Sequence, residues 1–159
     1  MPQLSSFEWD AALRLLAAVG CGLLLGFNRD LKNKPTGMRT LGLVSLGACL
    51  VALASLQSDP LRTNPDAMSR VVQGVLQGVL TGVGFIGAGV VLKLPGDRRV
   101  RGLTTAATVW VTAALGVACA FASWPLLTFG LVLTLLVLIL PRRIAKALGG
   151  DFDSPDDDD

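Results

Sequence analysis

Histidine is absent from the 159 residues, and cysteine occurs only three times. Cys21, Cys49 and Cys119 fall within long apolar runs, and no two of them have the C-x-x-C spacing of a zinc site. An odd number of cysteines in apolar segments gives no disulfide framework, so we interpret each one as a small packing residue. The sequence therefore predicts neither a zinc site nor a set of disulfide bonds.

Charged side chains are scarce as well, at 16% of the chain, and they gather in clusters between long uncharged runs. No Asp or Glu lies deep in these runs, although a strong Mg²⁺ site needs one or two carboxylates. The chain also lacks the phosphate-binding run G-x-x-x-x-G-K-[ST] and the phosphorylatable run D-K-T-G. We therefore expect no enzyme, no ATP-driven pump and no cofactor, although weak Mg²⁺ binding by the aspartate-rich tail stays open.

Apolar residues dominate instead, at 52% of the chain with a mean hydropathy of +0.59. A run of about 20 apolar residues is long enough to cross the hydrocarbon core as a helix. The uncharged stretch from Gly102 to Pro141 is too long for one span, and Ser123-Trp124-Pro125 breaks it. The sequence predicts an all-α integral membrane protein with about five transmembrane helices, near 9–27, 40–57, 71–92, 103–121 and 125–140.

Lys and Arg alternate between the connections, with four, two, four and none, followed by three after the last span. Basic residues favour the cytoplasmic side, so this pattern puts the N-terminus outside and the C-terminus in the cytoplasm. The opening residues MPQLSSFEWD lack the basic start of a cleavable signal peptide, so we expect the first span to stay in the protein. We expect a transmembrane domain at 1–148 and an acidic, disordered tail at 149–159.

Two stretches of the chain resemble each other. KPTGMRTLGLVSLGACLVA and RRVRGLTTAATVWVTAALG share a basic lead, a glycine, a threonine and then a span rich in small residues. A parallel duplication of a helical hairpin explains this similarity, and convergence on membrane composition is the alternative. Duplication would bring both basic segments side by side on the cytoplasmic face.

A glycine-rich run, GVGFIGAG at 82–89, fits the spacing G-x-G-x-x-G. A dinucleotide site also needs an acidic residue roughly 20 positions later, and that region, RGLTTAATVWVTAALG, contains none. We interpret the run as part of a membrane helix whose glycines let another helix approach closely, and we expect a homo-oligomer through these glycines. The expected packing residues are Gly74, Gly78, Gly82, Gly84, Gly87 and Gly89.

Polar residues at helical spacing lie beside these glycines and on the following span. Threonines in a membrane helix often bond their own backbone four residues back. Alternatively, the two stripes face each other inside the bundle and form a permeation path or a buried hydrogen-bonded seam. The residues of this predicted polar stripe are Gln73, Gln77, Thr81, Arg101, Thr104, Thr105 and Thr108.

The first basic segment, GFNRDLKNKPTGMRT, contains a turn signal at Pro35-Thr36-Gly37. Its basic residues suit anionic lipid headgroups, at roughly 1 kcal/mol each. A binding surface for an anion or a partner is the functional alternative. The candidate functional residues of this block are Asn28, Arg29, Asp30, Gly37, Arg39 and Thr40.

Three blocks in this order, GFNRDLKNKPTGMRTLGLVSLGA, RVVQGVLQGVLTGVGFIGAGVVLK and VRGLTTAATVWVTAALG, resemble the signature blocks of the MgtC/SapB family of bacterial inner-membrane proteins. The resemblance covers about residues 10–120 and fits a short form without the soluble C-terminal domain of some members. The family usually has an acid in a G-L-E-R-type run, where this chain has Asn28, so a role for that carboxylate is in doubt unless Asp30 substitutes.

The resemblance implies a multi-pass inner-membrane protein of Mg²⁺ homeostasis, with a role in virulence and survival at low Mg²⁺ or inside host cells. It also implies a regulator that contacts a membrane partner such as the F-type ATP synthase. A transporter or channel for Mg²⁺ or another small solute is the alternative, and a lipid-binding or structural role for the basic face is a third. The expected surroundings are the lipid bilayer, and no nucleic acid is expected as a partner.

Overall fold

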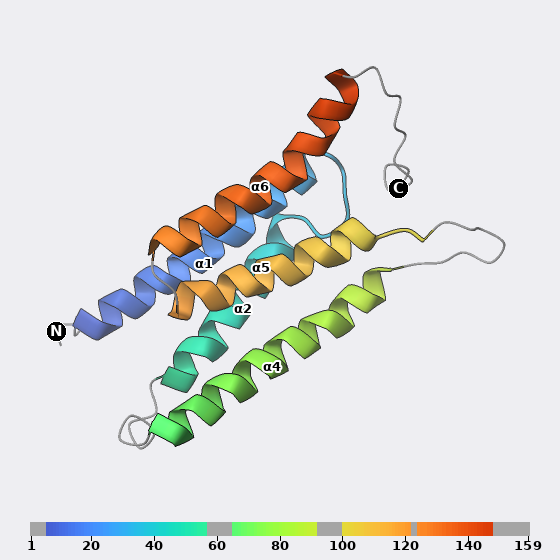
Figure 1. Cartoon of the computed structure of the whole chain (residues 1–159). Coiled ribbons are helices and arrows are strands. Elements are labelled where there is room, and N and C mark those ends of the chain that lie inside the picture. Colours follow the sequence, from blue (N-terminus) through green and yellow to red (C-terminus); the bar gives the residue numbers. More distant parts are fainter. Residues whose placement is uncertain (1–5, 57–64, 92–99, 122–123, 148–159) are drawn as a thin grey trace.

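The computed structural model describes residues 6–56, 65–91, 100–121 and 124–147, and helices account for nearly all of them (Figure 1). The predicted all-α fold is confirmed. The predicted acidic tail at 149–159 lies outside the described residues. In chain order the helices are α1 (Ser6–Asp30), α2 (Met38–Leu56), α4 (Pro65–Val90), α5 (Leu103–Phe121) and α6 (Trp124–Ala147).

The first four of these helices are long and apolar enough to cross a membrane. The helix α6 contributes a shorter apolar stretch, Trp124–Ile139, and it begins where Pro125 stands, because proline is well tolerated in the first turn of a helix. The chain is therefore a multi-pass membrane protein. The predicted fifth span corresponds to α6.

The central pair of the bundle is α2 and α5, and α5 contacts all four other helices. The helix α1 packs on α2 and α5, and α4 packs on the same two helices, while α6 packs along α5. As a result, α4 and α6 lie at opposite edges of the bundle in Figure 1. The two hairpins α1–α2 and α4–α5 are packed mainly through their second helices.

Glycine lets backbones touch in the centre of the bundle, although at different positions from those predicted. A Cβ atom added to Gly22 or Gly26 of α1 would collide with the backbone of α2, and one added to Gly116 of α5 would collide with the carbonyl of Ser45. Gly22 and Gly26 have the G-x-x-x-G spacing of close helix pairs. These three glycines allow the closest backbone contacts between α1, α2 and α5.

The packing role predicted for most glycines of α4 is wrong within the chain. Only Gly87 packs, with its added Cβ 3.5 Å from the Cβ of Ala106. The reason is the rotation of α4, which turns buried Val83 and partly buried Leu76 and Val79 toward the core. No described atom of another helix lies within 4 Å of a Cβ added to the other five predicted glycines, Gly74, Gly78, Gly82, Gly84 and Gly89.

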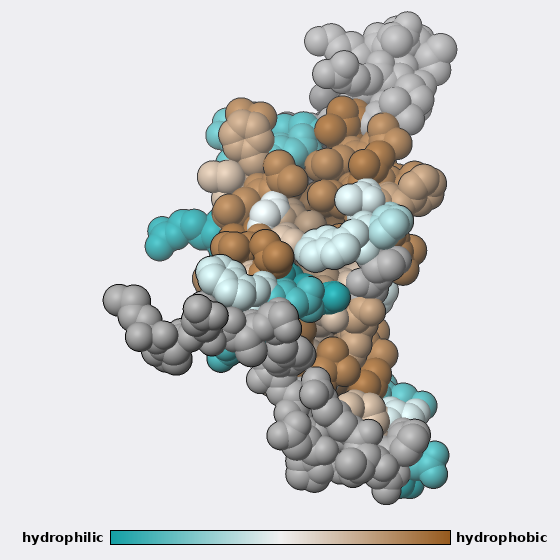
Figure 2. Space-filling model, turned by 90° about the vertical axis from the view of Figure 1, so that its left-hand side faces the viewer, coloured by the Kyte–Doolittle hydropathy of each residue, from teal (hydrophilic) through white to brown (hydrophobic). Residues whose placement is uncertain are grey.

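Large apolar side chains cover much of the outer surface, as Figure 2 shows for one face. Phe85 on α4 is 84% exposed, and Phe129 on α6 is 67% exposed. A water-soluble domain rarely exposes a continuous apolar surface of this kind, whereas lipid requires one. The exposed apolar surface and the length of the apolar helices therefore both indicate a protein that lies in a membrane.

Candidate functional site

Arg29 is a buried cation at the end of α1. It lies in the last turn of the helix, and only 4% of its surface is exposed. Its guanidinium donates hydrogen bonds from Nη2 (2.8 Å) and Nε (3.1 Å) to the carbonyl oxygen of Pro35. A cation in this position also interacts favourably with the negative end of the helix dipole. The guanidinium thus fixes the connection between α1 and α2.

The same guanidinium reaches across to α5, where Nη2 donates to Oγ1 of Thr105 at 2.5 Å and Nη1 lies 3.4 Å from Oγ1 of Thr108. Both threonines are buried. We call Arg29, Pro35, Thr105 and Thr108 the Arg29 junction. In this junction the guanidinium of Arg29 links the end of α1 to the connecting segment and to the start of α5.

The threonines of α5 also bond their own backbone. Oγ1 of Thr108 donates to the carbonyl of Thr104, and Oγ1 of Thr112 donates to the carbonyl of Thr108, each at 2.7 Å. The backbone-bonding interpretation is therefore confirmed for these two residues. Because the hydroxyl proton of Thr108 points to Thr104, its oxygen lone pairs are left to accept from Arg29.

Asp30 holds the other side of the same connection. Its Oδ2 accepts a hydrogen bond of 3.0 Å from the backbone N–H of Met38, the first residue of α2. A carboxylate at this place caps the helix and suits its positive dipole end. A Cβ atom on Gly37 would collide with this carboxylate, so a side chain there would displace the cap of α2. Arg29 and Asp30, neighbours in sequence, therefore fix opposite ends of the turn.

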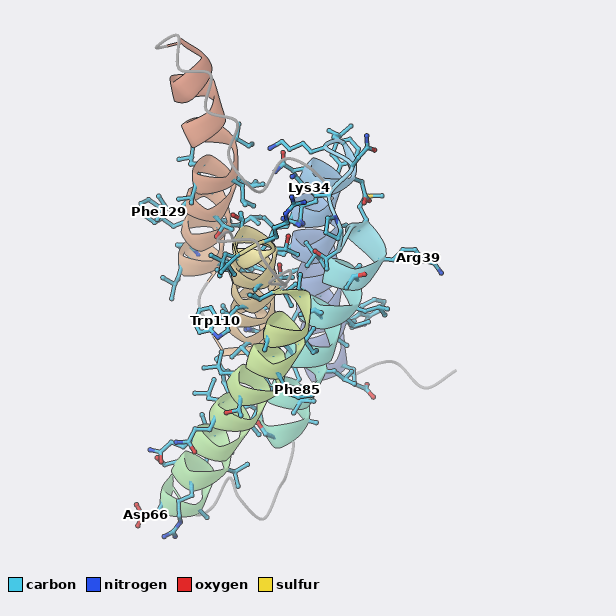
Figure 3. All side chains as sticks on the ribbon, turned by 90° about the vertical axis from the view of Figure 1, so that its right-hand side faces the viewer. Lys34, Arg39, Asp66, Phe85, Trp110 and Phe129 are labelled. Atoms are coloured by element: carbon cyan, nitrogen blue, oxygen red, sulfur yellow. The ribbon has the colours of Figure 1, made fainter. Side chains whose placement is uncertain are left out.

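The other candidates of the first block lie away from this junction. Asn28 is half-buried, while Arg39 and Thr40 are exposed. Figure 3 shows Arg39 reaching outward from α2, away from the bundle. Arg101 is half-buried and lies just before α5. The next residue, Gly102, has a φ of 84° and touches the Val90 carbonyl, so no side chain fits there. The structure thus brings together only part of the predicted set.

The two predicted polar stripes do not face each other. Gln73, Gln77 and Thr81 are exposed on α4, on the side turned away from α5, whereas Thr108 is buried against Arg29. The expectation that Gln77 and Thr108 form one seam is wrong, because α4 packs on α5 through the other side of the helix, around Val83. We call the exposed side of α4 its outer face, defined by Gln73, Gly74, Gln77, Gly78, Thr81 and Gly82.

A groove runs between α5 and α6, beside the Arg29 junction, with a volume of about 280 Å³. At one end, Nζ of Lys32 lies 3.4 Å from the carbonyl oxygen of Leu138. This groove was not predictable from the sequence, because it depends on how α6 packs on α5. The lining residues of this α5/α6 groove are Thr104, Ala107, Thr108, Val111, Leu133, Thr134, Val137 and Leu138.

Arg14 plays a similar linking role at the opposite end of α5. It forms an ion pair of 2.7 Å with Asp10, four residues earlier on the same helix. Its Nη1 also donates to the carbonyls of Cys119 (2.9 Å) and Ala120 (3.1 Å), and its guanidinium lies 5.8 Å from the ring centre of Trp124. A cation at a helix C-terminus satisfies carbonyls that have no partner within the helix. Sequence spacing showed the local pair and missed the contacts across the bundle.

No cluster of three or more metal-ligating side chains exists among the residues that the structure describes. The Arg29 junction presents a fixed positive charge and hydroxyl oxygens. An arrangement of this kind can hold helices together or attract an anion, but it repels a divalent cation.

Comparison with known proteins identifies the family. The model of the MgtC family matches residues 15–147, which include the Arg29 junction and the α5/α6 groove. The chain belongs to the MgtC family. The predicted resemblance is thus confirmed. No solved structure matches this chain.

Three relatives illustrate the similarity. Protein SrpB of Synechococcus elongatus is 40% identical over 87% of this chain and 79% of its own length. Protein MgtC of Salmonella typhimurium is 35% identical over 86% of this chain. The "Putative magnesium transporter YhiD" of Escherichia coli (strain K12) is 38% identical over 78% of this chain. The matches cover 54% of that MgtC and 56% of that YhiD, so this chain spans about half the length of these two relatives.

Proposed function

We propose that this MgtC-family protein serves Mg²⁺ homeostasis in the bacterial inner membrane, at low Mg²⁺ or during intracellular survival, by regulating a membrane partner through helix contacts. Family membership and the names of the Salmonella and Escherichia relatives support the link to Mg²⁺. In the proposed orientation the N-terminus is outside, and the Arg29 junction lies at the cytoplasmic end of the bundle. Figure 3 agrees with this orientation, since Lys34 and Asp66 lie toward opposite ends of the molecule.

The proposal of helix contacts rests on the outer face of α4. Gln73, Gln77 and Thr81 are exposed there, and their side chains make no hydrogen bond within the described part of the chain. In hydrocarbon, amide and hydroxyl groups are stabilised by hydrogen bonds to another helix, and neighbouring glycines let that helix approach closely. A second copy of this chain and the F-type ATP synthase are the proposed partners.

A transporter of Mg²⁺ is the second candidate, and the name of the Escherichia relative favours it. The interior of the described bundle opposes it. The hydroxyl donors of Thr108 and Thr112 are used on backbone carbonyls, and a buried guanidinium lies beside them. A divalent cation passing this point would meet a fixed positive charge in a region of low dielectric constant.

Flux into liposomes separates the two functions. The purified full chain is inserted into liposomes that contain a trapped Mg²⁺ indicator, and its helical content is verified by circular dichroism. We expect uptake equal to that of liposomes with an unrelated inserted membrane protein. Saturable uptake above that control would refute the regulator proposal and establish transport.

A further inference from the structure

The α5/α6 groove has the dimensions of a chain-like occupant. From Thr104 to Val111, α5 rises about 10 Å, which is the length of the groove along the helix. A helix segment of this length, 10–12 Å across, has a volume of about 800 Å³ or more. The groove holds about 280 Å³, so a partner helix could lie over its opening but could not enter it whole. One hydrocarbon chain is narrow enough.

The walls of the groove are apolar. Ala107, Val111, Leu133 and Val137 contribute only carbon from their side chains. The hydroxyl of Thr134 donates to the carbonyl of Gly130 at 2.7 Å, and that of Thr108 is also used within its own helix. A water molecule needs two to four polar partners to be held in such a space. The chemistry of the walls therefore favours an apolar occupant over water or a hydrated ion.

A positive charge stands at one end of the groove. Nζ of Lys32 lies 3.4 Å from the carbonyl of Leu138, which is a lining residue, and Arg29 is bonded to Thr108, which also lines the groove. In the proposed orientation this end lies in the cytoplasmic leaflet. That leaflet contains the anionic phospholipids of the membrane, and each Lys or Arg near its surface attracts them. The apolar groove thus suits the acyl chain of one lipid molecule, and the positive charge suits its phosphate.

We propose that the α5/α6 groove binds one anionic phospholipid, with an acyl chain between α5 and α6 and its phosphate at the ammonium group of Lys32. This site goes beyond the proposed function and rests only on the proposed orientation. Because Thr108 belongs to both the groove and the Arg29 junction, the lipid lies directly against that junction. The content of anionic lipid in the membrane then affects the packing of α1 on α5.

Photolabelling of the unmodified chain tests the position of the lipid. The full chain is placed in nanodiscs with phosphatidylglycerol that carries a diazirine in its acyl chain, and labelled peptides are identified by mass spectrometry. We expect labels concentrated on 104–111 and 133–138. Labels spread over all lipid-facing helices in proportion to their exposure would overturn the proposal, because they indicate only bulk lipid.

Variants test the two parts of the site separately. Native mass spectrometry measures how much phosphatidylglycerol and how much phosphatidylcholine the unmodified chain retains. We expect the chain to retain more of the anionic phosphatidylglycerol. Lys32→Gln should reduce this preference about fivefold, the equivalent of about 1 kcal/mol for one surface charge. Arg39→Gln is the matched control, because Arg39 points away from the bundle (Figure 3), and its loss should lower the preference less than the loss of Lys32.

Filling the groove is the complementary change. Ala107→Phe places a ring in the groove from an exposed position of α5, so the bundle should fold, and retention of both lipids should fall to the background. Circular dichroism verifies the helical content of each variant. Equal retention of the two lipids by the unmodified chain, or equal losses in Lys32→Gln and Arg39→Gln, would refute the site. None of these results depends on Mg²⁺ flux, so the lipid site and the proposed function fail independently.

Discussion

Replacing Thr105 by valine tests the Arg29 junction directly. The two side chains have nearly the same shape, and Thr105 is 6% exposed, so the change mainly removes a hydroxyl acceptor from the guanidinium of Arg29. Thr112 is the matched control on the same helix. It is fully buried, and its hydroxyl donates to the carbonyl of Thr108, within α5. Thr105→Val and Thr112→Val therefore remove the same group in different surroundings.

The expected difference follows from the charge of the partner. A hydrogen bond to a charged group contributes about 1.5–3 kcal/mol, and a buried donor that loses its acceptor adds a desolvation cost. A threonine that bonds its own helix contributes little, since that bond competes with the helical backbone bond. We expect Thr105→Val to lower the free energy of unfolding by about 2 kcal/mol. We expect Thr112→Val to lower it by about 0.5 kcal/mol or less.

A double-mutant cycle with Arg29→Met isolates the interaction. Unfolding of the purified chain by sodium dodecyl sulfate in mixed micelles can be followed through tryptophan fluorescence, for which Trp110 on α5 is a reporter. In the Arg29→Met background, Thr105→Val should cost about 0.5 kcal/mol or less, because the guanidinium is gone. Equal costs for the two valine variants, or an undiminished cost of Thr105→Val without Arg29, would refute the junction.

Three glycine substitutions give further predictions. Gly37→Ala should destabilise the protein by about 1–2 kcal/mol, since its Cβ displaces the Asp30 carboxylate that caps α2. Adding Asp30→Ala to Gly37→Ala should then cause little further loss of stability, as measured by urea or detergent unfolding. Gly78→Leu on the outer face of α4 should leave the melting temperature of the protein unchanged, because the space there is open. The same variant should fail to restore growth at low Mg²⁺ to cells that lack the unmodified protein. Gly26→Leu should prevent folding, as seen by membrane level and proteolysis, because its side chain collides with the backbone of α2. Full rescue by Gly78→Leu would exclude the outer face as a contact surface.

The helices were predictable from the sequence, because long apolar runs and basic connections are local features. The members of the Arg29 junction were also predictable singly, since Arg29, Thr105 and Thr108 are polar residues at the ends of apolar runs. Their contact was not predictable, because it joins positions far apart in the chain and depends on how closely α1 approaches α5. That approach in turn rests on Gly22 and Gly26, which the sequence did not distinguish from other glycines.

Glycine spacing alone could not tell inner from outer helix faces. Gly22 and Gly26 on α1 have the same i, i+4 spacing as Gly74 and Gly78 on α4, yet the first pair touches α2 and the second pair faces outward. Spacing fixes which residues share a face, while the rotation of the helix in the bundle is set by its apolar side. On α4 the larger side chains around Val83 occupy the inner side.

The position of α5 links the outer face of α4 to the end of the bundle that holds the Arg29 junction. The helix α4 contacts α5 closely at Gly87 and Ala106, and one helical turn of α5 around Ala106 carries Thr105 and Thr108 to the guanidinium of Arg29. A partner helix that shifts α4 would therefore act on the Arg29 junction through a single intervening helix. Packed helices respond to such contacts by small sliding motions. A regulator of this design would need no ion path through the bundle, because binding at one edge would change the surface and the α5/α6 groove at another.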